Sequence, residues 1–396
     1  MGRFRVSGTQ VITLGCRLNL SESEQIRAML AREDDLVVVN SCAVTSEAVR
    51  QTRQAIRRAR RANPDARLLV TGCAGDIERD QLAAMPEVDG FVANTQKLDP
   101  RAWNAPANVP PTPQDRTRAF IAVQNGCDHA CTFCVIPQGR GPSRSLTIGQ
   151  VLGEVERHLD HGAAEVVLTG VDVTSWGHDL PDPPPLGALV EAVLRRFPQL
   201  ERLRMSSLDG IEIDPLLFEL FAGERRLMPH LHLSLQHGHD LILKRMKRRH
   251  SRADAIDLVT RLAARRPDLA VGADLIAGFP TETEEHHAAN LAIIRELRIV
   301  HAHVFPYSPR PDTPAARMPQ VDRATIKRRA ADLRDTARTT RDAWLSTLVE
   351  KPHAVLAERD GTGYTPHFAR VALPGTVPAG TITTVTPSKH ENGLLE

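Results

Sequence analysis

The sequence lacks an apolar run of the roughly 18 residues that a helix needs to cross a bilayer. Its first residues, MGRFRVSGTQVITL, also lack the apolar stretch and small-residue cleavage site of an export signal. We therefore expect a cytoplasmic protein with no membrane partner. In that reducing compartment, the six cysteines are expected to be metal ligands or catalytic groups rather than disulfides.

The sequence also lacks an excess of charge of either sign. Its 50 basic and 48 acidic residues leave a formal net charge of +2. This balance excludes a strong field over the whole protein, so a polyanionic partner must be bound by local basic patches. The length of 396 residues, with 41% hydrophobic and 25% charged residues, predicts a globular protein of two or three domains.

A third absence concerns the stretch GCDHACTFC, which contains Cys127, Cys131 and Cys134 and is followed by no further cysteine. A structural zinc site normally has four protein ligands. His129 lies inside the loop, but its position leaves it little room to reach the same metal. Three thiolates also suit a cubane iron–sulfur cluster, which would keep one iron open to an exogenous ligand.

The first 98 residues alternate strand-like and helix-like patterns. The expected strands are residues 9–14, 36–40, 67–72 and 90–94. The stretches SESEQIRAMLA and SEAVRQTRQAIRRARR between them are expected to be helices that open at serine N-caps. This alternation predicts a domain with a parallel α/β sheet over residues 1–98.

Cys16, Cys42 and Cys73 each follow one of these predicted strands by one or two residues. The carboxyl ends of parallel strands form the ligand crevice of an open α/β sheet. We therefore expect the three cysteines to converge at one edge and form a second metal site. The alternative is that each is merely a small buried residue.

The remaining chain divides into four predicted parts. Residues 99–118 are a proline-rich linker, residues 119–320 hold six strand–helix units, residues 321–350 form a connecting helix, and residues 351–396 form a small β domain. The six units predict a partial (β/α)6 barrel of the TIM type, with its chemistry at the carboxyl ends of the strands. Its helices are expected to begin near Thr147, Leu186, Pro215, Arg252 and Glu284.

The CxxxCxxC motif after the first barrel strand resembles that of the radical S-adenosylmethionine (radical SAM) enzymes. TLGCRLN, NSCAVTSEAVRQTRQ and VTGCAGD resemble the cysteine motifs of the methylthiotransferases within that superfamily. HLHLSLQHG, LKRMKRRHS, DLIAGFPTETEE and HVFPYSPRPDTPAARMP look most like the branch usually called MtaB. The resemblance covers roughly residues 9–320.

This resemblance implies two 4Fe–4S clusters and S-adenosylmethionine as cofactors. The radical SAM cluster would be held by Cys127, Cys131 and Cys134, and the auxiliary cluster by Cys16, Cys42 and Cys73. Each cluster would keep one iron open, the first for S-adenosylmethionine and the second for the sulfur to be transferred. The implied partners are tRNA, an electron donor such as a flavodoxin or ferredoxin, and a sulfur donor.

The resemblance also suggests residues that contact the cofactor. These candidates are Phe133, Gly170, Ser206, Ser207 and Gln236, although a core or turn role is the alternative for each. The sequence departs from the commoner family pattern at several neighbouring positions, namely Asp209, His237, His239 and Thr281.

Two basic stretches are candidate tRNA contacts. The first is a predicted helix with Arg50, Arg53 and Arg57, and the second is a patch with Lys244, Arg245, Lys247, Arg248 and Arg249. The alternative for both is a solvated surface. The C-terminal stretch resembles a TRAM domain, a small RNA-binding β-barrel module, in which Tyr364 and Phe368 are either base-stacking or core residues.

The resemblance to the MtaB branch implies a tRNA methylthiotransferase that adds a methylthio group to carbon 2 of N6-threonylcarbamoyladenosine at position 37. The alternatives are a methylthiotransferase acting on isopentenyladenosine in tRNA or on an aspartate of a ribosomal protein. A cysteine-ligated metal protein that binds RNA without catalysis is the non-enzyme alternative.

Overall fold

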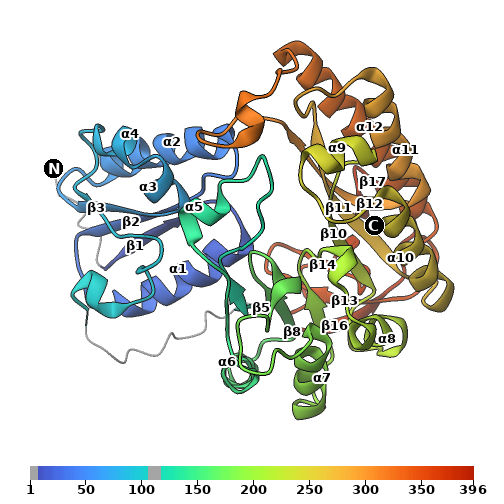
Figure 1. Ribbon diagram of the computed structural model, residues 1–396. Helices are drawn as coiled ribbons and strands as arrows, with labels where there is room; N and C mark the ends of the chain where they lie inside the picture. The colour runs from blue at the N-terminus through green and yellow to red at the C-terminus, as the bar shows by residue number, and fades with distance from the viewer. Residues whose placement is uncertain (1–7, 106–116) are drawn as a thin grey trace. The chain divides into compact units, whose positions relative to one another are not determined.

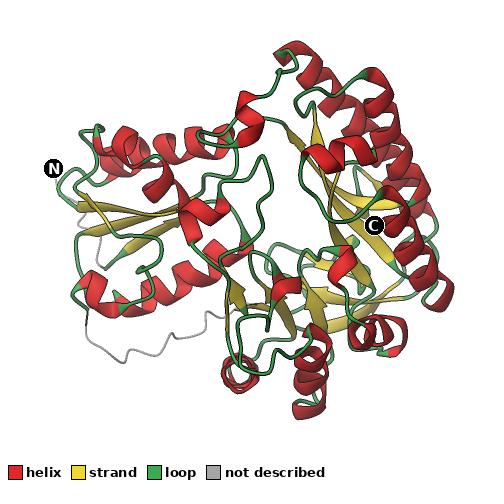
Figure 2. Cartoon of the chain, in the orientation of Figure 1, coloured by secondary structure: helices red, strands yellow, loops and turns green. Residues whose placement is uncertain are grey.

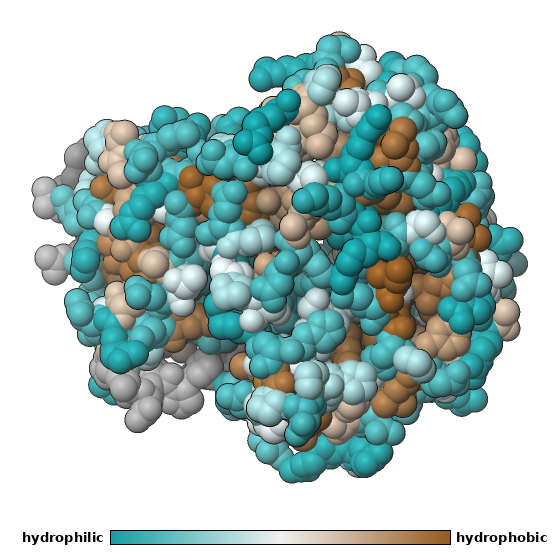
Figure 3. All heavy atoms as spheres, viewed as in Figure 1, coloured by the Kyte–Doolittle hydropathy of each residue, from teal (hydrophilic) through white to brown (hydrophobic). Residues whose placement is uncertain are grey.

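The computed structural model describes residues 8–105 and 117–396, which form two compact units (Figure 1). The first unit holds residues 8–105, 125–144 and 308–313, and the second holds residues 117–124, 145–307 and 314–396. The predicted linker 99–118 lies largely outside the described residues. Among those described, no helix is long and apolar enough to cross a membrane. Figure 3 shows a mainly hydrophilic face with hydrophobic residues in small separate groups.

The first unit contains a four-stranded parallel sheet in the order β1-β2-β3-β4, as predicted. Its strands are β1 (Gln10–Thr13), β2 (Leu36–Ser41), β3 (Arg67–Gly72) and β4 (Gly90–Phe91). Its helices are α1 (Arg17–Met29), α2 (Ser46–Ala62), α3 (Cys73–Ile77), α4 (Arg79–Ala83), α5 (Ile136–Arg140) and the 3-10 turn η1 (Pro100–Trp103). Every residue of β2 is buried, because apolar side chains cover both faces of the sheet.

The predicted serine N-caps of the two helices are wrong. Helix α1 begins four residues before Ser21, directly after Cys16, whose extended backbone ends the preceding loop. Ser21 and Ser23 are instead buried within the helix. Helix α2 is capped by Thr45, whose side chain accepts a hydrogen bond from the backbone N–H of Ala48 at 3.1 Å.

The second unit contains the six predicted strand–helix units. The parallel strands form two three-stranded sheets, made of β5 (Arg118–Ala122), β8 (Glu165–Thr169) and β9 (Leu203–Met205), and of β10 (His230–Gln236), β11 (Ala270–Ala277) and β12 (Ile299–Pro306). Single parallel bridges, such as Leu208 with Leu233, join the two sheets. The short strands β6 (Gln124–Asn125) and β7 (Arg144–Ser145) lie where the chain passes between the units.

Helices cover one side of these strands, as Figure 2 shows. They are α6 (Ile148–Asp160), α7 (Leu186–Arg196), α8 (Pro215–Gly223), α9 (Asp240–Arg245), α10 (Arg252–Arg265) and α11 (Glu284–Glu296), with 3-10 turns η2 (Val173–Ser175), η3 (Gly210–Glu212) and η4 (Pro314–Arg317). The five predicted helix starts agree with these bounds. A continuous apolar core lies between strands and helices, which confirms the predicted α/β barrel fold.

The chain ends in a long helix and a small sheet, also as predicted. Helix α12 (Arg323–Ser346) packs against β12 and α11. The sheet has the order β16-β13-β14-β15-β18-β17. Its strands are β13 (His353–Ala357), β14 (Thr362–Tyr364), β15 (Arg370–Ala372), β16 (Ile382–Val385), β17 (His390–Glu391) and β18 (Leu394–Leu395).

Candidate functional site

The structure brings Cys16, Cys42 and Cys73 to one edge of the first unit's sheet, where β1, β2 and β3 end. Burial, together with the charges of the nearby Cys73 and Cys16, raises the pKa of the Cys42 thiol to about 11. Gly15 has a φ of +91°, and a Cβ atom there would lie 2.7 Å from the Cys42 sulfur. The glycine therefore lets the loop before α1 pass directly over Cys42.

The other three cysteines lie on the loop between β6 and α5, which belongs to the same unit. Burial, with Cys131, Cys127 and Cys73 nearby, raises the pKa of the Cys134 thiol to about 12. The backbone N–H of Ile136 donates a hydrogen bond to the Cys134 sulfur at 3.4 Å. The two cysteine triads are thus neighbours within one compact unit.

A buried charge network joins this loop to the sheet. One carboxylate oxygen of Glu22 lies 2.8 Å from Arg140 Nη1, and the other lies 2.5 Å from Lys97 Nζ. At most 2% of any of these side chains is exposed. Although burial opposes it, the two cations hold the pKa of Glu22 below its usual range. Burial raises the pKa of the nearby Cys73 thiol, and the positive charges of Arg140 and Lys97 oppose this effect.

Sequence reasoning missed this network, because Glu22 and Arg140 are 118 positions apart and no local pattern links them. A second long-range ion pair in the same unit joins Arg310 Nη2 to Glu78 Oε1 at 2.7 Å, with both side chains 5% exposed. The segments 125–144 and 308–313 are therefore bound to the N-terminal sheet by buried charges.

Asn94 connects Cys73 to helix α5, which follows the second cysteine triad. Its side-chain amide donates a hydrogen bond to the carbonyl oxygen of Gly139 in α5 and lies 3.7 Å from the Cys73 sulfur. Its side-chain oxygen and the Thr71 hydroxyl are buried without a hydrogen-bond partner among the described residues. Three soft thiol ligands in each triad, with unsatisfied polar atoms beside one of them, fit an iron–sulfur cluster at each triad.

Four of the predicted cofactor contacts lie at the carboxyl ends of barrel strands. Gly170 follows β8, Ser206 and Ser207 follow β9, and Gln236 ends β10. The Ser206 hydroxyl is buried without a partner among the described residues, which suits a polar ligand. Gln236 has a φ of +70°, a conformation that is uncommon for residues other than glycine and recurs at functional sites.

Gly170 and Phe133 have different surroundings. A Cβ atom on Gly170 would lie 2.8 Å from the backbone oxygen of Gln124. The end of β8 and strand β6 therefore come so close that position 170 requires a glycine, whether or not a ligand is bound. Phe133 is half-buried on the cysteine loop of the first unit, whereas the other four candidates belong to the second unit.

The predicted RNA contacts on α2 have acidic or amide neighbours. Arg50 bonds Glu47, Arg53 bonds Gln81, and Arg57 lies 3.9 Å from a Glu87 oxygen. At least half of the Arg50 and Arg57 side chains is exposed, so they remain accessible to phosphate.

The second patch divides into two kinds of residue. Lys244 and Lys247 are exposed and have no acidic partner among the described residues. Arg245 donates to the Thr281 hydroxyl at 2.8 Å. Arg248 and Arg249 lie 2.7 and 2.6 Å from oxygens of Asp209 and Glu212, respectively. Asp209, one of the departures from the family pattern, is 4% exposed. Its carboxylate therefore holds Arg248 in place through a buried ion pair.

Tyr364 and Phe368 are packing residues in this structure. Their rings stack 4.6 Å apart with an interplanar angle of 16°, and Phe368 also stacks on His230 at 5.2 Å. The guanidinium groups of Arg118 and Arg204 lie 4.8 Å from the ring centroids of Tyr364 and Phe368, respectively. The C-terminal domain thus uses these aromatic residues to bind the amino-terminal ends of barrel strands.

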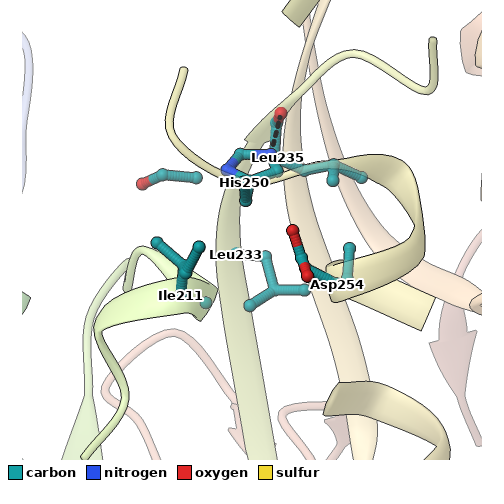
Figure 4. Close-up of a pocket in the computed structure, with 8 residues that line it drawn as sticks. Ile211, Leu233, Leu235, His250 and Asp254 are labelled. Carbon is teal, nitrogen blue, oxygen red and sulfur yellow. Dashed lines mark hydrogen bonds between the residues drawn. The ribbon is translucent and has the colours of Figure 1, made fainter. Parts of the chain in front are cut away.

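A small surface hollow lies beside η3 and α10 (Figure 4). Ile211, Leu233, Leu235, His250 and Asp254 line it. His250 is fixed by a 3.1 Å contact between its Nε2 and the carbonyl oxygen of Leu235. The hollow contains none of the predicted site residues, and its walls are mainly apolar, so it is not the candidate catalytic site.

Comparison with known proteins gives two family matches. Residues 121–292 match the model of the Radical SAM superfamily, and residues 9–93 match that of the uncharacterized protein family UPF0004. The fold is similar to that of the radical S-adenosylmethionine methyltransferase TsrM from Kitasatospora setae, with a TM-score of 0.54 and 16% identity over 75% of this chain and 68% of that one.

Several curated proteins are similar over most of the chain. The threonylcarbamoyladenosine tRNA methylthiotransferase MtaB of Rickettsia prowazekii (strain Madrid E) is 44% identical over 92% of this chain and 91% of its own. MtaB of Bacillus subtilis (strain 168) is 33% identical over 92% and 90%. The tRNA-2-methylthio-N(6)-dimethylallyladenosine synthase of Frankia alni (strain DSM 45986 / CECT 9034 / ACN14a) is 34% identical over 82% and 72%. The chain belongs to the radical SAM methylthiotransferase family, in the MtaB branch, and takes the cofactors of that family, 4Fe–4S clusters and S-adenosylmethionine.

Proposed function

We propose that this enzyme converts N6-threonylcarbamoyladenosine at position 37 of tRNA to its 2-methylthio derivative. The observation that carries the proposal is the pairing of two cysteine triads in one compact unit. The 44% identity to an MtaB methylthiotransferase supports the threonylcarbamoyl substrate. A cysteine-ligated RNA-binding protein without catalysis is no longer a candidate, because the family consists of enzymes.

In this proposal each triad has a separate task. Cys127, Cys131 and Cys134 would hold the radical SAM cluster, and Cys16, Cys42 and Cys73 the auxiliary cluster. When bound, the clusters and S-adenosylmethionine supply the radical chemistry that an inert adenine C–H bond requires. The chain's own contribution is to fix three ligands at each cluster and to keep an open iron position at each.

The surrounding residues would position and stabilise these groups. Glu22, Arg140 and Lys97 hold the cysteine loop against the sheet and provide a net positive charge beside the thiolates. Ser206, Ser207 and Gln236 would offer polar groups to S-adenosylmethionine at the strand ends. Gly170 would leave space beside it, and Phe133 would lie near its adenine.

We further propose that tRNA phosphates contact Arg50, Arg53 and Arg57 on α2, and Lys244 and Lys247 at the end of α9. An electron donor such as a flavodoxin or ferredoxin and a separate sulfur donor are needed to complete the reaction. Because its proposed substrate is tRNA, we place the reaction in the cytoplasm.

A second candidate substrate is isopentenyladenosine in tRNA. The 34% identity to a tRNA-2-methylthio-N(6)-dimethylallyladenosine synthase supports it, but this value is lower than the 44% identity to the MtaB of Rickettsia prowazekii. An aspartate of a ribosomal protein, the third substrate considered, has no comparable support among these relatives.

Mass spectrometry of tRNA nucleosides from a strain without this gene tests the substrate. We expect the 2-methylthio form to disappear and N6-threonylcarbamoyladenosine to accumulate, with recovery when the intact gene is restored. Loss of the 2-methylthio form of isopentenyladenosine instead would assign the second substrate.

Cysteine variants test the division between the triads. We expect Cys131→Ala to abolish cleavage of S-adenosylmethionine to 5′-deoxyadenosine. Cys42→Ala should leave part of that cleavage intact but stop thiolation of tRNA, because it removes a ligand of the auxiliary cluster only. Normal tRNA modification by Cys42→Ala would contradict the two-cluster division.

A further inference from the structure

We infer that His232, Asp274 and His303 form a binding site for a divalent first-row metal ion inside the barrel. The three side chains come from the adjacent parallel strands β10, β11 and β12, which lie side by side in Figure 1. They include no cysteine and lie in the second unit, whereas all six cysteines lie in the first. The group therefore shares no residue with either predicted cluster site.

Strand register places the three residues on one face of the sheet. Asp274 lies opposite His303, and His232 lies opposite Gly272. The alternate residues Leu231 and Leu233 belong to the apolar core under the helices, so His232 faces the opposite, interior side. A Cβ atom on residue 272 would lie 2.3 Å from His232 Nδ1, so the imidazole occupies space that only a glycine leaves.

The donor atoms have the spacing of a metal coordination sphere. Asp274 Oδ1 lies 3.1 Å from His232 Nε2 and 3.1 Å from His303 Nδ1. One ligand atom from each residue lies within 4.8 Å of the other two. Metal bonds of about 2.0–2.2 Å place neighbouring ligand atoms roughly 3.0–3.5 Å apart, so small movements suffice to coordinate one ion.

Solvent can reach this group of side chains, and one carboxylate oxygen in it is available to coordinate a metal ion. The His303 side chain is 59% exposed and that of Asp274 is 20% exposed. Both short contacts use Asp274 Oδ1, and Oδ2 has no hydrogen-bond partner among the described residues. With both imidazoles neutral, the group carries one negative charge. A 2-His-1-carboxylate set suits Zn²⁺, Fe²⁺ or Mn²⁺ and leaves open positions for oxygen donors.

Titration of the cluster-loaded protein with Mn²⁺, followed by the EPR signal of the free ion, tests this site. Mn²⁺ is the probe because it prefers oxygen donors such as a carboxylate over thiolates, so the cysteines should not compete for it. We expect one bound Mn²⁺ per chain. Asp274→Asn and His303→Gln should each weaken binding by at least about tenfold, because the first removes the negative charge of the site and the second removes an imidazole ligand.

His161→Gln is the matched control, because His161 is an exposed histidine of the same unit outside the group and should bind Mn²⁺ like the wild type. The exposed position of His303 keeps His303→Gln informative if Asp274→Asn does not fold. An absence of Mn²⁺ binding by the wild type, or equal binding by His303→Gln, would overturn the inference. Because no tRNA is present, neither result depends on the proposed substrate.

Discussion

Thr281 has a backbone conformation that is unfavourable for its branched side chain. Its φ is +68°, a left-handed conformation that is unfavourable for a β-branched residue. Glycine adopts this conformation without a steric penalty. The strain is offset in part by Arg245, which donates a hydrogen bond to the Thr281 hydroxyl at 2.8 Å.

We predict that Thr281→Gly raises the free energy of unfolding by about 1 kcal/mol, because relief of the backbone strain exceeds the loss of the hydroxyl's hydrogen bonds with Arg245 and with the carbonyl oxygen of Pro280. Chemical denaturation of the wild type and the variant measures this difference. Thr281→Ala is the control, because it keeps the strained φ and loses the hydroxyl, so it should lower stability. A Thr281→Gly variant less stable than Thr281→Ala would contradict the argument.

At the scale of elements, the basic patch after β10 contains two kinds of residue that its sequence does not distinguish. Lys244 and Lys247 are exposed without acidic partners among the described residues. Arg248 is only 8% exposed and lies 2.7 Å from the buried Asp209. Neighbouring basic residues therefore differ: the two lysines are open to solvent, whereas Arg248 and Arg249 join the end of α9 to η3 through ion pairs.

We predict that the double variant Lys244→Ala/Lys247→Ala weakens tRNA binding. The slope of the logarithm of the binding constant against the logarithm of the salt concentration should fall in magnitude by about 1 for each phosphate that is no longer neutralised. Its stability should stay within about 0.5 kcal/mol of the wild type, because both side chains are exposed. Arg248→Ala should instead cost roughly 3 kcal/mol of stability, since it leaves Asp209 buried without its closest cation. Binding isotherms at several salt concentrations and denaturation curves separate the two effects.

The elements and the cysteine edge were predictable because both depend on local patterns. Strand and helix periodicity predicts the sheet of the first unit, and three cysteines directly after three parallel strands must lie near one another. The start of α1 was not predictable from its serines, because Asn40 binds Ser23 inside the helix. Contacts between distant segments, such as Glu22 with Arg140, follow from the tertiary fold alone.

At the scale of the whole molecule, the C-terminal domain is part of the second unit's packing. Arg202 donates to the backbone oxygens of Tyr364 and Ala354, at 3.0 and 2.8 Å. Arg204 donates to that of Pro366 at 3.0 Å. Phe368 lies against His230 and Arg204, so this domain closes over the amino-terminal ends of the barrel strands.

We predict that Phe368→Ala lowers the free energy of unfolding by about 2 kcal/mol, because removal of the half-buried ring leaves a space between strands and domain. Its affinity for tRNA should not change, since the ring is already stacked. Asp360→Asn, which breaks an exposed ion pair with Arg370, is the control and should cost less than about 0.5 kcal/mol. Weaker tRNA binding with unchanged stability would favour the base-stacking alternative.

The buried pairs Glu22–Arg140 and Glu78–Arg310 also limit how this chain can be recombined with its relatives. Suppose that a graft replaces only the N-terminal portion, which holds Glu22 and Glu78, with that of a relative. The relative's residues at these two positions would then face the native segments 125–144 and 308–313. A mismatched partner at either pair would leave an uncompensated buried charge, which is strongly destabilising. A functional chimaera should therefore transfer three separate pieces of sequence together, and substitutions in these pieces are expected to be tolerated only in matched combinations.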